Sequence, residues 1–177
     1  MSASAPESSL AAAVRKRPRP GIMEDAVLTG ILGASVVAAF FLLIDTLRGQ
    51  PLYTPSLLGS VLFSGKSVDQ ALALDVTAVF AYTGLHVMLF IAAGAVLAWM
   101  VSQFDRNPQF GMVLLLIFLL FESVLFGFEV TLVPSLVGAL GAWAVGIANL
   151  LSAVVMFWYL LRRHPKAMAH LRASWYD

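Results

Sequence analysis

Residues 74–103, LDVTAVFAYTGLHVMLFIAAGAVLAWMVSQ, decide the fold of this chain. The stretch is almost entirely apolar, and no proline interrupts it. About 20 apolar residues are enough for a helix to cross the hydrocarbon core of a bilayer, so these residues predict a membrane-spanning helix. The capping-box pattern Ser67-Val-Asp-Gln70 precedes it and is expected to open the helix. From there the helix would run roughly 50 Å, so it must tilt or project on the outer side.

Three further stretches have the same apolar character, at about 24–47, 109–133 and 135–161. Together with 74–103 they predict an all-α integral membrane protein, an antiparallel four-helix bundle whose membrane domain covers 21–163. Residues 1–20 are polar and basic and are expected to form a disordered tail. Residues 164–177 form a second tail, either frayed or an amphipathic interfacial helix.

The longest connection, RGQPLYTPSLLGSVLFSGK at 48–66, predicts a short helix between the first and second spans. Thr54 followed by Pro55 is a typical helix start, with the hydroxyl as the cap and proline at the first helical position. Ser64 and Gly65 end it. About ten residues are too few to cross a bilayer, so this helix should lie in the interface or pack over the bundle.

The composition excludes several functional classes. The 177 residues are 60% hydrophobic and only 12% charged, with a mean hydropathy of +0.87, which is outside the range of soluble globular domains. A net charge of +1 argues against a nucleic-acid partner. The absence of cysteine excludes disulfides, thiolate metal sites and iron–sulfur clusters. No nucleotide-binding glycine pattern or hydrolase motif is present.

The distribution of lysine and arginine predicts the orientation. Nine of these residues lie before residue 21, in the 103–108 turn or after residue 161, and only Arg48 and Lys66 lie in the other connections. The positive-inside rule therefore places both termini in the cytoplasm, which agrees with an even number of spans.

Small residues recur every four positions in two of the spans. Such stripes allow close approach of helices, and we expect the stripe of the first span to pack against that of the fourth. The residues are Gly30, Ala34 and Ala38 in the first and Gly138, Ala142 and Gly146 in the fourth.

The chemistry-bearing candidates are polar residues within the spans. Counting helical rise from the span ends places His86, Glu122, Asn149 and Ser35 at a similar depth, near the bilayer midplane. Glu129 lies two turns from Glu122 on the same helical face. Asp45 and Asp75 are expected to be helix-end residues facing headgroups, with Arg48 a possible partner. Ionisable groups in hydrocarbon are costly, which makes this layer the best functional clue.

The layer has several interpretations. His86 is a candidate axial ligand to a haem or a chlorophyll-type pigment, or a proton relay. A single transition metal would take His86, Glu122, Glu129 and Asn149 as ligands. In the structural interpretation, a neutral His86 bonds to Glu122 or to a backbone carbonyl, Glu122 is a protonated acid bridging helices, and Asn149 joins helices. A di-iron site is disfavoured because the chain lacks the Glu-x-x-His pairs that such bundles use.

The stretch RGQPLYTPSLLGSVLF at 48–63, after an apolar first span, resembles one found in small uncharacterised bacterial four-span inner-membrane proteins. The resemblance implies a bacterial inner membrane. It implies no activity and no residue roles.

Two functional hypotheses follow. The first is a non-catalytic accessory subunit of a larger energy-transducing membrane complex, of respiratory or photosynthetic type, whose partners are the bilayer and other membrane subunits. The second is a small membrane protein with a buried metal-, pigment- or proton-handling site built on His86 and Glu122. A transporter is less favoured, because the chain is short and shows no inverted repeat.

Overall fold

The computed structural model describes residues 21–71, 73–106, 116, 138 and 140–166. These residues form the α-helices α2 (Ile22–Leu47), α3 (Tyr53–Ser64), α4 (Val76–Arg106) and α7 (Ala142–Arg163), and the short 3-10 turn η1 (Val68–Gln70). Over this part of the chain there is no β-strand, and the expected all-α class is confirmed.

Three of these helices are long and apolar enough to cross a membrane: α2, α4 and α7. They contain 26, 31 and 22 residues, which at 1.5 Å per residue gives about 39, 46 and 33 Å. Each length reaches the ~30 Å of a hydrocarbon core. The span expected at 109–133 lies outside the described residues.

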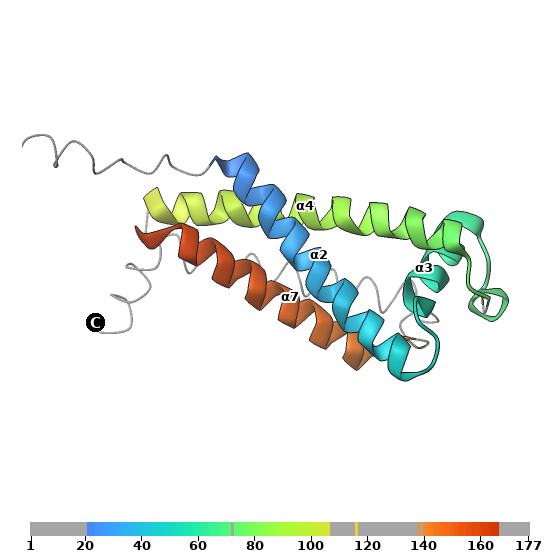
Figure 1. The fold of residues 1–177 in the computed structure, drawn as a ribbon. Helices are drawn as coiled ribbons and strands as arrows, with labels where there is room; N and C mark the ends of the chain where they lie inside the picture. The colour runs from blue at the N-terminus through green and yellow to red at the C-terminus, as the bar shows by residue number, and fades with distance from the viewer. Residues whose placement is uncertain (1–20, 72, 107–115, 117–137, 139, 167–177) are drawn as a thin grey trace, which may run out of the picture.

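Helix α2 lies across both α4 and α7 (Figure 1). The end of the bundle at which α2 begins is also the end at which α4 and α7 finish, so α4 and α7 run in the same direction and α2 runs against them. The short helix α3 lies at the opposite end, against the start of α4. The directions of these helices determine which residues from distant parts of the sequence come into contact.

Two apolar clusters hold the helices together. Near the α3 end, Phe41 of α2 and Leu57 of α3 pack with the small residues Ala144 and Ala148 of α7. At the other end, α4 and α7 bury a second cluster against each other, made of Leu97, Ala98, Met100, Val101, Met156, Leu160 and Leu161. Burial of such side chains is the main favourable term where water is displaced, and close packing adds dispersion energy where lipid is displaced.

The contact between α2 and α4 is backbone to backbone. A Cβ atom built on Gly94 would lie on the carbonyl oxygen of Ala26 and 2.7 Å from the nitrogen of Gly30. A Cβ on Gly30 would lie on the Cα of Ile91 and 2.6 Å from the carbonyl oxygen of Phe90. Only glycine permits this approach, as in other close helix pairs of membrane proteins.

Gly30, in the stripe of the first span, therefore packs against α4. Gly30 and Ala34 are buried, and Ala38 is exposed. The stripe on α7 does not face α2. Ala142 is exposed, and among the described residues no atom lies within 4 Å of a Cβ built on Gly146. Gly138 is exposed as well. The expected pairing of the two stripes is wrong.

The small residues of α7 that pack inward are Ala144, Ala148 and Ser152. The Ser152 hydroxyl donates a hydrogen bond to the carbonyl oxygen of Gly33, at 3.2 Å. Positions two residues apart on a helix differ by about 200° around its axis, so this row is on the face opposite the expected one. Both faces of α7 carry small residues, and packing selects between them.

Helix α3 is capped from the end of α2. The Asp45 carboxylate accepts hydrogen bonds from the backbone N–H of Thr54, at 2.7 Å, and from its hydroxyl, at 2.8 Å. Asp45 is 0% exposed, which corrects the expectation that it faces headgroups. Thr54 is also not the cap, because α3 begins at Tyr53, after Leu52 in a left-handed conformation.

The start of α4 also differs from the expected one. The backbone N–H of Ser67 donates to the Gln70 side chain, at 3.2 Å, but this pattern closes only the turn η1. Asp75 caps α4 instead, since its carboxylate accepts from the backbone N–H of Ala78 at 3.0 Å. The Ser56 hydroxyl of α3 accepts from the backbone N–H of Asp75, at 2.8 Å, so α3 and α4 are joined at this cap.

We predict that Asp75 makes this junction sensitive to acid. The Ala78 N–H, which has the largest effect, and the Lys66 ammonium at 3.5 Å hold the pKa of Asp75 below its usual range, against the opposing effect of burial. A lowered pKa adds stability that is fully present above the ordinary value of about 3.9 and is lost as the pH falls through the folded-state value.

The test is Asp75→Asn, which keeps a good capping side chain but does not titrate. The change in thermal midpoint between about pH 6 and about pH 3 should be smaller in the variant than in the native chain. An identical change in both proteins would show that Asp75 contributes nothing to the acid response.

Candidate functional site

His86 lies about a third of the way along α4 and contacts α2. Its Nε2 is 3.3 Å from the carbonyl oxygen of Ala34. A carbonyl only accepts, so a hydrogen on Nε2 is required for this bond. The imidazole also stacks on Tyr82, with ring centroids 5.7 Å apart, and packs at a tilt against Phe90, at 4.7 Å. The ring is thus held by a backbone acceptor of α2 and by two aromatic rings of its own helix.

This arrangement corresponds to one of the two structural interpretations, in which His86 bonds to a backbone carbonyl. The bond uses Nε2 and leaves Nδ1 as the nitrogen that a metal or pigment would need. The Ala34 carbonyl is already part of the α2 helix, so the contact also joins the backbone of α2 to α4 near the Gly30 and Gly94 crossing.

Among the described members of the expected polar layer, neither Asn149 nor Ser35 forms a hydrogen bond with His86. Glu122 and Glu129 lie outside the described residues. Asn149 is half-buried on α7, and Ser35 is exposed on α2. Among the described residues, no three histidine, aspartate or glutamate side chains lie close enough to share a metal ion.

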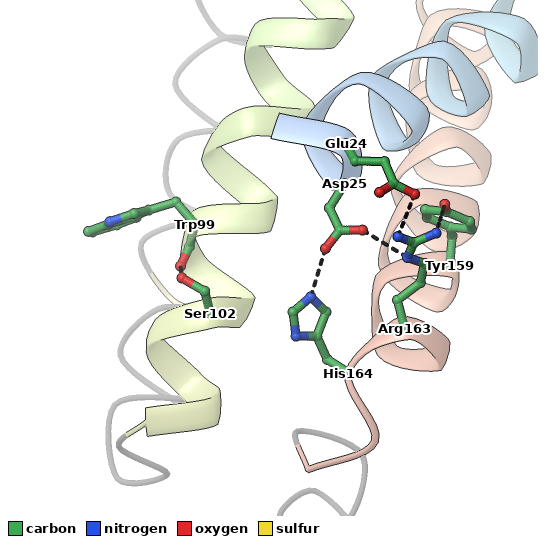
Figure 2. Close-up of polar contacts among 7 residues, drawn as sticks. All are labelled: Glu24, Asp25, Trp99, Ser102, Tyr159, Arg163 and His164. Carbon is green, nitrogen blue, oxygen red and sulfur yellow. Dashed lines mark hydrogen bonds and ion pairs between the residues drawn. The ribbon is translucent and has the colours of Figure 1, made fainter. Parts of the chain in front are cut away.

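A polar cluster of described residues lies elsewhere, at the end where α2 begins and α7 finishes (Figure 2). Arg163 forms ion pairs with Glu24, at 2.8 Å, and with Asp25, at 2.9 Å. The Nε2 of His164 is 3.1 Å from the other carboxylate oxygen of Asp25. The Arg163 guanidinium also donates to the Tyr159 hydroxyl, at 3.3 Å. We call these five residues the ionic cluster.

Burial decides which contacts of the ionic cluster matter. Asp25 is 1% exposed, whereas more than half of the Glu24 side chain is accessible. An exposed ion pair contributes about 0–1 kcal/mol. Removing one partner of a buried pair costs about 3–5 kcal/mol, because the remaining charge stays desolvated. The Asp25–Arg163 contact is therefore the one that fixes the end of α7 to the start of α2.

The charges also suit the ends of their helices. Glu24 and Asp25 lie in the first turn of α2, and Arg163 lies in the last turn of α7. Carboxylates stabilise the positive end of a helix dipole, and cations stabilise the negative end. Their contact was not predicted from the sequence. The available signal was that the predicted topology puts both segments at the same membrane surface.

Exposed tryptophans lie near the same end of the bundle. Trp99 of α4 points away from the ionic cluster (Figure 2) and is exposed. Trp158 of α7 is 51% exposed, and the Arg162 guanidinium lies over its ring, 3.7 Å from the centroid. Tryptophan is enriched where a membrane helix passes from hydrocarbon to headgroups, so both positions suit an interface.

The described residues thus define a helical protein with three helices that are long and apolar enough to cross a membrane. An ion pair with the buried Asp25 joins the start of α2 to the end of α7. Comparisons with protein-family models, with curated proteins and with solved structures give no match.

Proposed function

We propose that this protein is a non-catalytic accessory subunit of a larger energy-transducing complex, of respiratory or photosynthetic type, in a bacterial inner membrane. The observation that carries the proposal is that the buried and half-buried ionisable side chains named next, all among the described residues, serve internal structure. His86 bonds to a backbone carbonyl, Asp45 caps α3, and Asp25 pairs with Arg163 and His164. Such residues in a membrane protein are functional candidates by default, and here each has a structural partner.

The proposed topology has four spans and cytoplasmic termini. Support for an even number comes from the described helices: α4 finishes at one end of the bundle and α7 begins at the other. The fourth span, proposed at 109–133, lies between them in the sequence. The ionic cluster lies at the end that the positive-inside rule places in the cytoplasm, and Arg48 and Lys66 lie at the other.

The outer surface supports a membrane partner as well as lipid. Large apolar side chains are exposed along α4 and α7 among the described residues: Phe80, Met88, Leu89, Val96, Leu150, Leu151, Val154 and Phe157. In a bilayer this surface is covered by acyl chains or by apolar helices of another subunit. An accessory role needs such a surface and a rigid interior, and the glycine crossing of α2 and α4 supplies rigidity.

Replacement of His86 tests the proposal against the site hypothesis. In the accessory role, His86→Leu removes one hydrogen bond and should cost about 0.5–1.5 kcal/mol of stability. Assembly with partner subunits and any activity of the complex should remain. His86→Phe keeps an aromatic ring between Tyr82 and Phe90 and should behave alike. The measurements are the thermal midpoint and the amount of chain recovered in its complex.

The second candidate is a metal-, pigment- or proton-handling site built on His86 and Glu122. The half-buried position of His86 within the apolar helix α4 is the observation that favours it. Under this hypothesis both His86 variants remove a ligand or a proton acceptor while the chain stays folded. Loss of activity or of an optical absorption band, at unchanged stability, would overturn the accessory role.

A further inference from the structure

Two neighbouring arginines at the end of α7 have opposite environments. Arg163 faces the bundle interior, where two carboxylates pair with it. Arg162 lies on the outer side over the ring of Trp158, one helical turn before it. Among the described residues, the ion pairs of this end involve Arg163 and His164 and leave out Arg162. Arg162 therefore carries a positive charge on the surface that the ionic cluster does not neutralise.

Stacking on Trp158 prepares Arg162 to bind an anion. A guanidinium is planar, and its five N–H donors point outward in that plane. When one face covers an indole ring, the edge with the donors stays accessible and its orientation is restricted. This edge matches two oxygens of a phosphate group, which arginine binds in a bidentate manner. Stacking also lowers the entropy that the side chain loses on binding.

The position of the pair indicates the source of the phosphate. Arg162 is next to the last residue of α7, and Trp158 is one turn deeper. A tryptophan one turn deeper than an arginine suits the boundary between acyl chains and headgroups, and the arginine then lies at the level of the headgroups. Lys166, four residues further along the chain and exposed, adds a second cation at this end. Cationic groups at the cytoplasmic surface attract anionic lipids.

We propose that Arg162, held on Trp158, binds the phosphate of an anionic phospholipid in the cytoplasmic leaflet. This inference rests on the membrane placement given under the proposed function, and it holds whether or not the chain has an accessory role. Arg163 then has a structural role, and the adjacent Arg162 binds lipid.

The test is native mass spectrometry of the full chain released from mixed micelles of phosphatidylglycerol and phosphatidylcholine. The native chain should retain phosphatidylglycerol preferentially. Arg162→Gln should lower this preference about fivefold, the factor expected for one arginine at an anionic membrane surface. Trp158→Leu should lower it too, whereas Trp158→Phe should keep most of it. Arg48→Gln, which removes the same charge at the opposite end of α2, is the matched control and should change nothing.

Three outcomes would overturn the inference: equal preference in the native chain and Arg162→Gln, equal loss in Arg162→Gln and Arg48→Gln, or complete displacement of phosphatidylglycerol by added inorganic phosphate. The first excludes the site, the second shows a nonspecific charge effect, and the third shows a site for free phosphate. Unchanged thermal midpoints in phosphatidylcholine confirm that each variant is folded. A chain that fails to enter the membrane fraction would contradict the membrane placement itself, which is a different result from loss of lipid preference.

Discussion

Replacing Gly94 by leucine is expected to separate α2 from α4 and to lower the free energy of unfolding by about 3 kcal/mol or more. The new Cβ alone would overlap the Ala26 carbonyl and approach the Gly30 nitrogen to 2.7 Å. These are backbone atoms, so no rotamer change relieves the overlap. Gly94→Ala should already cost about 1–3 kcal/mol. The measurement is the unfolding free energy in detergent or the thermal midpoint.

Gly84 of the same helix is the matched control. Among the described residues, no atom lies within 4 Å of a Cβ built there. Gly84→Ala should leave stability unchanged or raise it by up to about 1 kcal/mol, because alanine favours a helix more than glycine does. Equal losses for the two positions would contradict a close α2–α4 crossing at Gly94.

Replacing Arg163 by methionine should cost about 3–5 kcal/mol, because Asp25 then keeps a buried carboxylate with His164 as its remaining partner in the ionic cluster. Methionine preserves much of the side-chain length, so the loss reports the charge. Arg162→Met is the control, since it removes a surface arginine next in sequence and should cost no more than about 0.5 kcal/mol in a neutral detergent.

A double-mutant cycle completes this test. Asp25→Leu removes the carboxylate, so adding Arg163→Met to it should cost much less than Arg163→Met alone. A coupling energy well above 0.5 kcal/mol is expected for residues in contact. Additive losses would show that the two side chains do not stabilise each other, and the ends of α2 and α7 would then be held by apolar packing alone.

The apolar runs of the sequence predict the long helices well, because length and composition alone determine that such segments form helices in a bilayer. Expected spans at 24–47 and 74–103 compare with α2 at Ile22–Leu47 and α4 at Val76–Arg106. The fourth apolar run, expected to be helical from 135, contains α7 from Ala142. What the runs cannot give is the rotation of each helix. On α7 the rows through Ala142 and Ala144 both consist of small residues, and contact with Gly33 selects the second.

Local capping patterns predict the helix starts less well than the apolar runs predict the helices, since the residue that caps a helix can come from another segment. Thr54 with Pro55 has the pattern of a helix start, but the acceptor that caps α3 is Asp45, nine residues earlier. Ser67 and Gln70 form their expected bond and close a turn of three residues. Asp75, placed three residues before the Ala78 N–H, was a second capping signal that the continuous apolar pattern concealed.

The candidate site was also predicted only in part. The sequence predicts a depth near the bilayer midplane for His86 and offers two partners for it, a carbonyl or Glu122. Every residue has a carbonyl, so no pattern singles out Ala34. The ionic cluster joins Glu24 and Arg163 across 139 positions. Such a contact follows only from the topology, and the positive-inside assignment already placed both residues at one surface.

The central claim, an accessory subunit whose ionisable groups serve structure, is tested most directly by isolating the chain from its native membrane in a mild detergent. The account predicts a particle larger than the 19.1 kDa chain in its micelle, with other membrane subunits at a fixed ratio that His86→Leu leaves unchanged. A lone monomer that carries a stoichiometric metal or pigment, lost in His86→Leu, would contradict it.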